Sequence, residues 1–290
     1  MDWSKAKNIL IIAFIVTNML LVLHLGKDIY VGRDIQIISD KYIQDVENHL
    51  AENGIKVKGN IPREILSLPV LMVKYQYFQP EEAAEGLLGE GYRLLKKGHY
   101  QLGNKSLSVL GDKKLIYKDT SNIAVNYGLD EKEAEELATE FLRNKGLYNN
   151  NLKMEQVYYG VVREFDEVPL YKLVYHQTYK NRFLGESFVN VYVNYRGIVG
   201  MEALLLNTEK TQQLKKKVIP ATEALLMKMN DIINDNHGEI LITNIEIGYY
   251  FNPEEIQEAD WETIESGTAF PSWRIILQNG KTYYVEAIKN

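Results

Sequence analysis

The chain has 290 residues, a formal net charge of −6 and no cysteine. The negative charge argues against binding of nucleic acid or of an anionic lipid surface. The lack of cysteine excludes a disulfide framework and thiol chemistry. With 46% hydrophobic residues, a chain of this length can bury one or two cores.

The N-terminal region contains an apolar run from Ile9 to Leu25. The run exceeds the apolar stretch of a cleavable signal peptide, and no Ala-x-Ala pattern follows it. As a helix it would span roughly 26 Å, slightly less than the hydrocarbon core of a bilayer. The sequence therefore predicts an uncleaved signal anchor with a cytoplasmic stub at 1–8 and a transmembrane helix at 9–25. The alternative is a buried N-terminal helix of a soluble protein.

The flanks of this run set the expected orientation. Trp3, Lys5 and Lys7 lie before it, where an indole at the interface and two ammonium groups form a cytoplasmic-side anchor. Short basic flanks are retained in the cytoplasm. We therefore expect a single-pass protein of the cell membrane, with its N-terminus in the cytoplasm and its remaining domains outside the cell.

Polar residues within the run predict a contact with a partner helix. Thr17 and His24 share one face, Ala13 lies one turn before Thr17, and Asn18 flanks this stripe. Polar groups inside hydrocarbon tend to face protein. The alternative is that His24 lies at headgroup level while Thr17 bonds a carbonyl of its own helix.

Residues 26–125 are expected to form a first extracellular α+β domain. Apolar residues recur at helical spacing between Ile37 and Leu50, and Gly54 ends that helix. The β-branched and aromatic stretch 68–78 predicts a strand, and residues 91–118 predict two or three more.

Residues 126–290 are expected to form a second extracellular region built from two similar units. Asp130 caps an acid-led helix in the unit 126–210, and Pro220 opens the helix of the unit 218–290. In each unit a strand meander follows the helix, and the polar stretch 207–217 is expected to be the joint between them. The predicted fold class is α+β, with helix-on-antiparallel-sheet modules after one transmembrane helix.

No catalytic constellation stands out in the sequence. The five histidines show no zinc-binding spacing, and no G-x-S-x-G motif is present. The S-x-x-K pattern occurs only from Ser4 to Lys7, within the short stub. Acidic residues are plentiful, but no pair is singled out as a glycosidase acid and base. We therefore expect no enzyme activity, no metal and no cofactor.

The opening stretch "MDWSKAKNILIIAFIVTNMLL" closely resembles the N-terminus of the YycI (WalI) family, membrane-anchored regulators of low-GC Gram-positive bacteria. The shared features are the first five residues together with Lys7, Phe14 and Asn18. The closing "FPSWRIILQNGKTYYVEA" also looks like the C-terminal strands of that family, which are similar to PepSY-type modules. The exported domains of the related YycH are similar α+β units.

This resemblance implies regulation of the WalK/WalR (YycG/YycF) two-component system. The expected partners are the sensor histidine kinase WalK and a YycH-like protein, and the expected role is control of cell-wall metabolism. An alternative is a PepSY-like extracellular module that binds or inhibits an exported protease or wall enzyme. An anchored wall hydrolase is a third option, for which the sequence offers no site.

Overall fold

The structure, a computed structural model, describes residues 7, 13–19, 36–121, 128–165, 167–255 and 261–288. Its labelled helices are α2 (Asp40–Glu52), α3 (Pro80–Leu88), α4 (Glu131–Asn144) and α5 (Ala221–Asp235), with short 3-10 turns at Pro253–Glu255 and Trp261–Thr263. The strands are β1 (Gln36–Ile37), β2 (Ile55–Val57), β3 (Glu64–Ile65), β4 (Ser67–Tyr75), β5 (Arg93–Lys96), β6 (His99–Leu102), β7 (Lys105–Leu110), β8 (Lys114–Asp119), β9 (Leu152–Val161), β10 (Pro169–Tyr179), β11 (Arg182–Asn194), β12 (Gly197–Leu204), β13 (Leu206–Lys217), β14 (Ile240–Phe251), β15 (Ser266–Leu277) and β16 (Thr282–Glu286). The predicted α+β class is confirmed.

The predicted cap of α4 is present in full. The Asp130 carboxylate accepts from the backbone N–H of Glu133 at 2.8 Å, while the Glu133 carboxylate accepts from the N–H of Asp130 at 3.1 Å. This reciprocal pair satisfies two N–H groups that the helix itself leaves without a partner. At the other end the backbone of Gly146 has a φ of 68°, which glycine adopts without strain.

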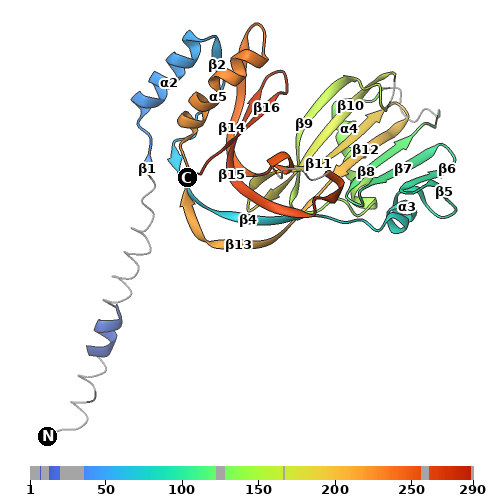
Figure 1. Cartoon of the computed structure of the whole chain (residues 1–290), viewed down its shortest axis with the longest axis horizontal. Helices are drawn as coiled ribbons and strands as arrows, with labels where there is room; N and C mark the ends of the chain where they lie inside the picture. Colours follow the sequence, from blue (N-terminus) through green and yellow to red (C-terminus); the bar gives the residue numbers. More distant parts are fainter. Residues whose placement is uncertain are drawn as a thin grey trace.

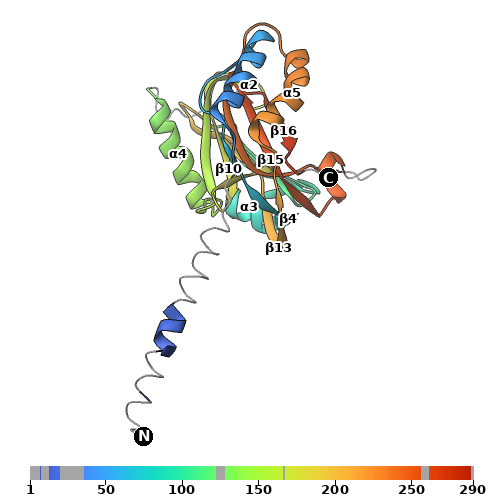
Figure 2. The ribbon, with the colours of Figure 1, turned by 90° about the vertical axis from the view of Figure 1, so that its left-hand side faces the viewer.

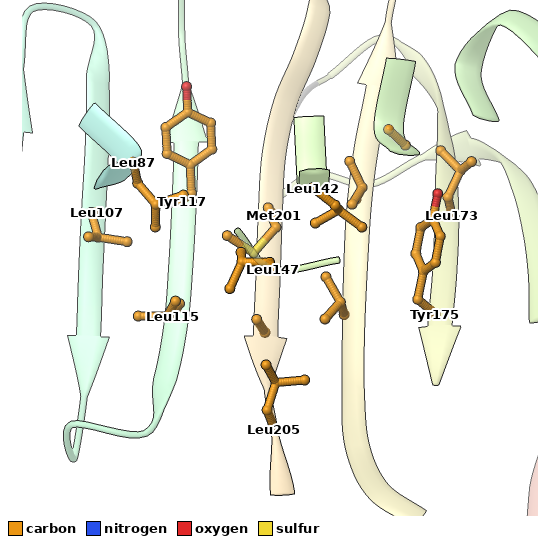
Figure 3. Close-up of a cluster of buried hydrophobic side chains, with 14 of the residues drawn as sticks. Leu87, Leu107, Leu115, Tyr117, Leu142, Leu147, Leu173, Tyr175, Met201 and Leu205 are labelled. Atoms are coloured by element: carbon orange, nitrogen blue, oxygen red, sulfur yellow. The ribbon is translucent and has the colours of Figure 1, made fainter. Parts of the chain in front are cut away.

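The large sheet is antiparallel throughout and has the strand order β9-β10-β11-β12-β8-β7-β6-β5. Each of its halves is a four-strand meander preceded by a helix, α3 before β5 and α4 before β9. Both helices pack on one face, where Leu87, Leu142 and Leu173 belong to a single buried cluster (Figure 3). That shared core makes the two meanders one packing unit.

The small sheet is built on β15, which pairs with β14 on one edge and with both β4 and β16 on the other. β13 extends it beyond β4, and β2 extends it beyond β14. Helices α2 and α5 cover its core, in which the buried Trp273 donates its indole N–H to the carbonyl of Ile219 at 2.8 Å. Figure 2 shows these two helices together at one end of the molecule, with α4 along the large sheet.

The two sheets are joined where strands pass between them (Figure 1). Leu184 and Gly185 of β11 pair in parallel with Tyr249 and Tyr250 of β14. A third buried cluster, which includes Tyr75 and Phe251, fills this junction. The side-chain amide of Gln177 also donates to and accepts from the backbone of Leu206, at 3.1 and 2.7 Å.

The structure changes two expectations about chain organisation. Residues 207–217 are not a joint, because they lie in β13 and pair with β4. The stretch 91–118 holds four strands rather than two or three. β8 pairs with β12 across the expected boundary at 125, so strands from both expected domains share the large sheet. The limits of the domains and of the units 126–210 and 218–290 stay a prediction.

Candidate functional site

The predicted partner-helix interface falls partly within the described residues. Ala13, Thr17 and Asn18 lie in a helical segment with exposed side chains. The Thr17 hydroxyl donates to the Ala13 carbonyl at 2.8 Å, and the Asn18 amide donates to the Phe14 carbonyl at 2.9 Å. Both polar groups therefore bond within their own helix, which lowers the cost of placing them in an apolar environment.

The remaining predicted anchor residues are mostly outside the described residues, since Trp3, Lys5 and His24 fall there. Lys7 is helical and exposed. Within the described segments, no helix combines the length and the apolar character that crossing a membrane requires. The interface and its orientation stay predictions.

The strongest polar constellation is a charge cluster at the junction of the sheets, which we call the junction cluster: Arg274, Glu155, Glu246 and His176. Arg274 is only 4% exposed. Its Nη1 donates to Glu155 Oε2 at 3.0 Å, and its Nε and Nη2 donate to Glu246 Oε1 at 3.1 and 2.5 Å. His176 Nε2 lies 2.9 Å from Glu155 Oε2. Glu155 and His176 come from the large sheet, and the other two come from the small sheet.

Aromatic rings surround the junction cluster. The guanidinium of Arg274 lies 4.4 Å from the centroid of the Phe183 ring, and Tyr284 stacks on Tyr250 at 4.0 Å. Burial raises the pKa of Glu155, but hydrogen bonds and charges from His176 and Arg274 outweigh it, so this pKa lies below its usual value. The cluster is therefore a charged bridge between the two sheets.

The geometry of the junction cluster does not suit nucleophilic catalysis. The nearby Ser187 is buried, its hydroxyl donates to the Leu184 carbonyl at 2.6 Å, and its backbone carbonyl is what faces His176 Nδ1, at 3.2 Å. A serine nucleophile needs its hydroxyl bonded to the histidine. Across the described segments no group of three acidic or histidine side chains could hold a metal ion.

A second titratable group lies at the same junction. Glu186 has a φ of 69° at the point where β11 turns from β14 toward its partners in the large sheet. This left-handed conformation is uncommon for a residue with a β-carbon. Burial raises the pKa of Glu186 to about 7, although the Tyr75 hydroxyl donates to its carboxylate at 3.5 Å. Part of the Glu186 population is therefore protonated at neutral pH.

Sequence reasoning missed both groups at the junction. Arg274, Glu155, Glu246 and His176 come from four strands, and no local spacing relates them. The one available signal is that Arg274 and Glu246 occur within otherwise apolar strand sequences, "WRIIL" and "IEIGYYF". A charge in such a strand needs a partner when the strand is buried.

Several solved structures are similar to this chain, among them the following two. An uncharacterized protein from Eubacterium rectale ATCC 33656 has a TM-score of 0.50 and 12% identity, and the alignment covers 85% of this chain and 97% of that one. YycH from Bacillus subtilis has a TM-score of 0.49 and 13% identity, with coverage of 78% of this chain and 56% of that one. At such identities the likeness to the first concerns the fold alone. No curated protein sequence matches.

The family comparison gives the identity of the chain. The sequence model of the YycI protein family matches residues 34–288. The match includes the helices and both sheets described above, and it begins after the opening stretch that first suggested the resemblance. It includes the closing stretch that also carried the resemblance, so the resemblance is confirmed and the chain belongs to the YycI family.

Proposed function

We propose that this chain is a non-enzymatic, membrane-anchored regulator of the sensor histidine kinase WalK that acts with a YycH-like protein in control of cell-wall metabolism. The observation that carries the proposal is the YycI family match over residues 34–288. YycI proteins are a regulatory family, and membership indicates a role in the WalK (YycG) system.

The physical mechanism is a shift in the balance between two arrangements of the kinase. A bound regulator moves such an equilibrium only by as much as its affinity differs between the two arrangements. A difference of about 1.4 kcal/mol changes their ratio tenfold. Contacts along one transmembrane helix and on one extracellular surface are of this order.

The decisive experiment measures WalK autophosphorylation in liposomes with and without the full chain, each in the presence and absence of the YycH-like protein. The proposal expects a change in rate that depends on this chain. Equal rates in all four samples would refute it. Co-purification from detergent separates the main alternative, because a PepSY-like inhibitor would bring down a protease or wall enzyme in place of the kinase.

The membrane orientation can be tested with single introduced cysteines, because the chain has no cysteine of its own that could react. A single cysteine at Asn60 should react with an impermeant maleimide in intact cells, because we place residues after 25 outside the cell. A cysteine at Ser4 should react only after the cells are opened. The reverse pattern would refute the orientation and with it the contact with the extracellular side of the kinase.

A further inference from the structure

One edge of β14 is incompletely paired. Its other edge pairs with β15, while on this edge β2 pairs with Ile240–Ile242 and β11 pairs with Tyr249 and Tyr250. Because β15 occupies the other edge, β2 and β11 lie one after the other along this edge, and both run parallel to β14. Between β2 and β11, residues 244–247 have no strand partner on this edge among the described segments of the chain.

A cavity of about 530 Å³ lies at this gap. Its lining includes the three consecutive residues Ile245, Glu246 and Ile247. Successive side chains of a strand point to opposite faces, so a cavity that touches all three lies at the edge of the strand and not on one face. We call this cavity the β14 slot.

The ends of the β14 slot are closed by the strands that flank it. At one end the N–H of Lys58 donates to the Ile242 carbonyl at 2.8 Å. At the other end the ring of Phe183 occupies the space that a β-carbon on Gly248 would need. With a rise of about 3.3 Å per residue, the free stretch accommodates about four residues of an extended chain.

The lining of the β14 slot combines apolar side chains with two arginines and two glutamates. Ile61 and Trp273 are buried there and give it an apolar floor. Arg63 lines the slot and pairs with Asp40 at 2.5 Å, and its neighbour Glu64, which also lines the slot, is exposed. Arg182 also lines the slot, is half-buried, and has no acidic partner within the described residues. Glu246 is already paired with Arg274, so of the two arginines that line the slot Arg182 is the one without an acidic partner.

We propose that the β14 slot binds an extended segment of a partner polypeptide, about four residues long, which pairs with the free edge of β14 and places an acidic side chain against Arg182. Addition of a strand to an open edge obtains affinity from backbone hydrogen bonds and specificity from alternate side chains. Four residues make few such bonds, so the slot suits a segment that other contacts already hold nearby. The identity of that partner rests on the proposed function, which supplies a complex in which the segment would be presented.

The first test uses a panel of fluorescein-labelled, acetylated hexapeptides of valine and threonine, each with one glutamate at a different position. A matched panel carries lysine at those positions, and a third carries proline at alternate positions to remove backbone donors. Fluorescence anisotropy with the full chain in detergent should show at least one glutamate peptide binding about tenfold more tightly than its lysine counterpart. The proline peptides should not bind. If no glutamate peptide is preferred, the proposal is wrong.

Two variants locate the binding. Arg182→Glu should reverse the preference between glutamate and lysine peptides, and Asn60→Trp should abolish binding by filling the slot from its exposed wall. Lys180→Glu is the matched control, because Lys180 lies on the same hairpin over the Tyr179 ring and is not part of the slot lining. It should leave affinity within twofold, and an equal effect of both charge reversals would refute a specific site. Circular dichroism verifies that each variant is folded.

The kinase assay separates this proposal from the proposed function. Arg182→Glu should reduce the effect of the chain on WalK autophosphorylation, whereas Lys180→Glu should not. If Arg182→Glu loses peptide binding but regulates the kinase like the wild type, the slot does not serve this complex and the proposed function stands. If the wild type has no effect on the kinase while the glutamate peptides bind as expected, the proposed function fails and the slot stands.

Discussion

The junction cluster gives a prediction whose size follows from its burial. Arg274→Met removes a guanidinium whose side chain is 5% exposed and leaves two carboxylates, of Glu155 and Glu246, that are 22% and 36% exposed. Breaking a buried ion pair by removing one partner costs about 3–5 kcal/mol, because the other charge stays buried without compensation. Water reaches both carboxylates in part, so we expect the low end, about 3 kcal/mol of lost stability.

The dependence on pH provides an internal check of this prediction. The pKa of Glu155 is held below its usual value, so the stability that this group contributes is present at neutral pH and is lost as pH falls through the lowered pKa. The variant lacks part of this contribution. The difference in unfolding free energy between wild type and Arg274→Met should therefore narrow below about pH 4.3, the ordinary pKa of a glutamate.

The assay is urea unfolding of residues 30–290, followed by circular dichroism and by tryptophan fluorescence, since Trp273 is buried in the small sheet. We expect this fragment to fold as a monomer in the absence of the N-terminal segment. Lys56→Met is the control, because Lys56 forms an ion pair with Glu239 in which both side chains are about two-thirds exposed, and it should cause no measurable change. The reasoning would be refuted if Arg274→Met lowered the unfolding free energy no more than Lys56→Met does, or if its effect did not change with pH.

Three further predictions concern other parts of the molecule. Glu186→Gln should raise stability at pH 8 by about 1–2 kcal/mol and have little effect at pH 4, because the pKa of about 7 makes ionisation of this buried group unfavourable above neutral pH; urea titrations at the two pH values check it. Leu142→Ala should cost about 3 kcal/mol, since this side chain is 0% exposed under the large sheet, whereas Leu94→Ala, at a position 59% exposed, should cost under about 0.5 kcal/mol in the same titration. Asn18→Leu should leave membrane insertion intact but weaken crosslinking to the kinase, and crosslinking equal to the wild type would show that the helix is only a tether.

Local signals in the sequence predicted the elements that local interactions determine. The cap at Asp130, the end of the first helix at Gly54 and the strand at 68–78 were all predictable, because each depends on neighbours within a few residues. The helix α3 was missed. Its sequence "PEEAAEGLL" contains an internal glycine that weakens the helical pattern, although Pro80 at its first turn favours a helix start.

The features that the sequence did not predict depend on pairing between strands that are distant in the chain. The stretch 207–217 is rich in lysine and glutamine, so it lacks the apolar alternation of a strand, yet β4 holds it as β13. The junction cluster and the β14 slot depend in the same way on which strands become neighbours. The candidate interface at Ala13, Thr17, Asn18 and His24 was a prediction from sequence alone and stays one.

The pairing of β4 with β13 has a consequence for the order of folding during synthesis. Leu206 pairs with Tyr75, so the small sheet is interrupted by about 130 residues that contain every strand of the large sheet. β4 has no partner within the small sheet until β13 has been made, whereas the large sheet is complete once β12 has emerged. Its completion brings the two halves of the small sheet together, since the N–H of Gln76 donates to the Leu205 carbonyl at 2.8 Å. Folding of the large sheet thus replaces a long loop closure by a short one. The small sheet then forms last, from the segments that precede and follow the large sheet in the chain.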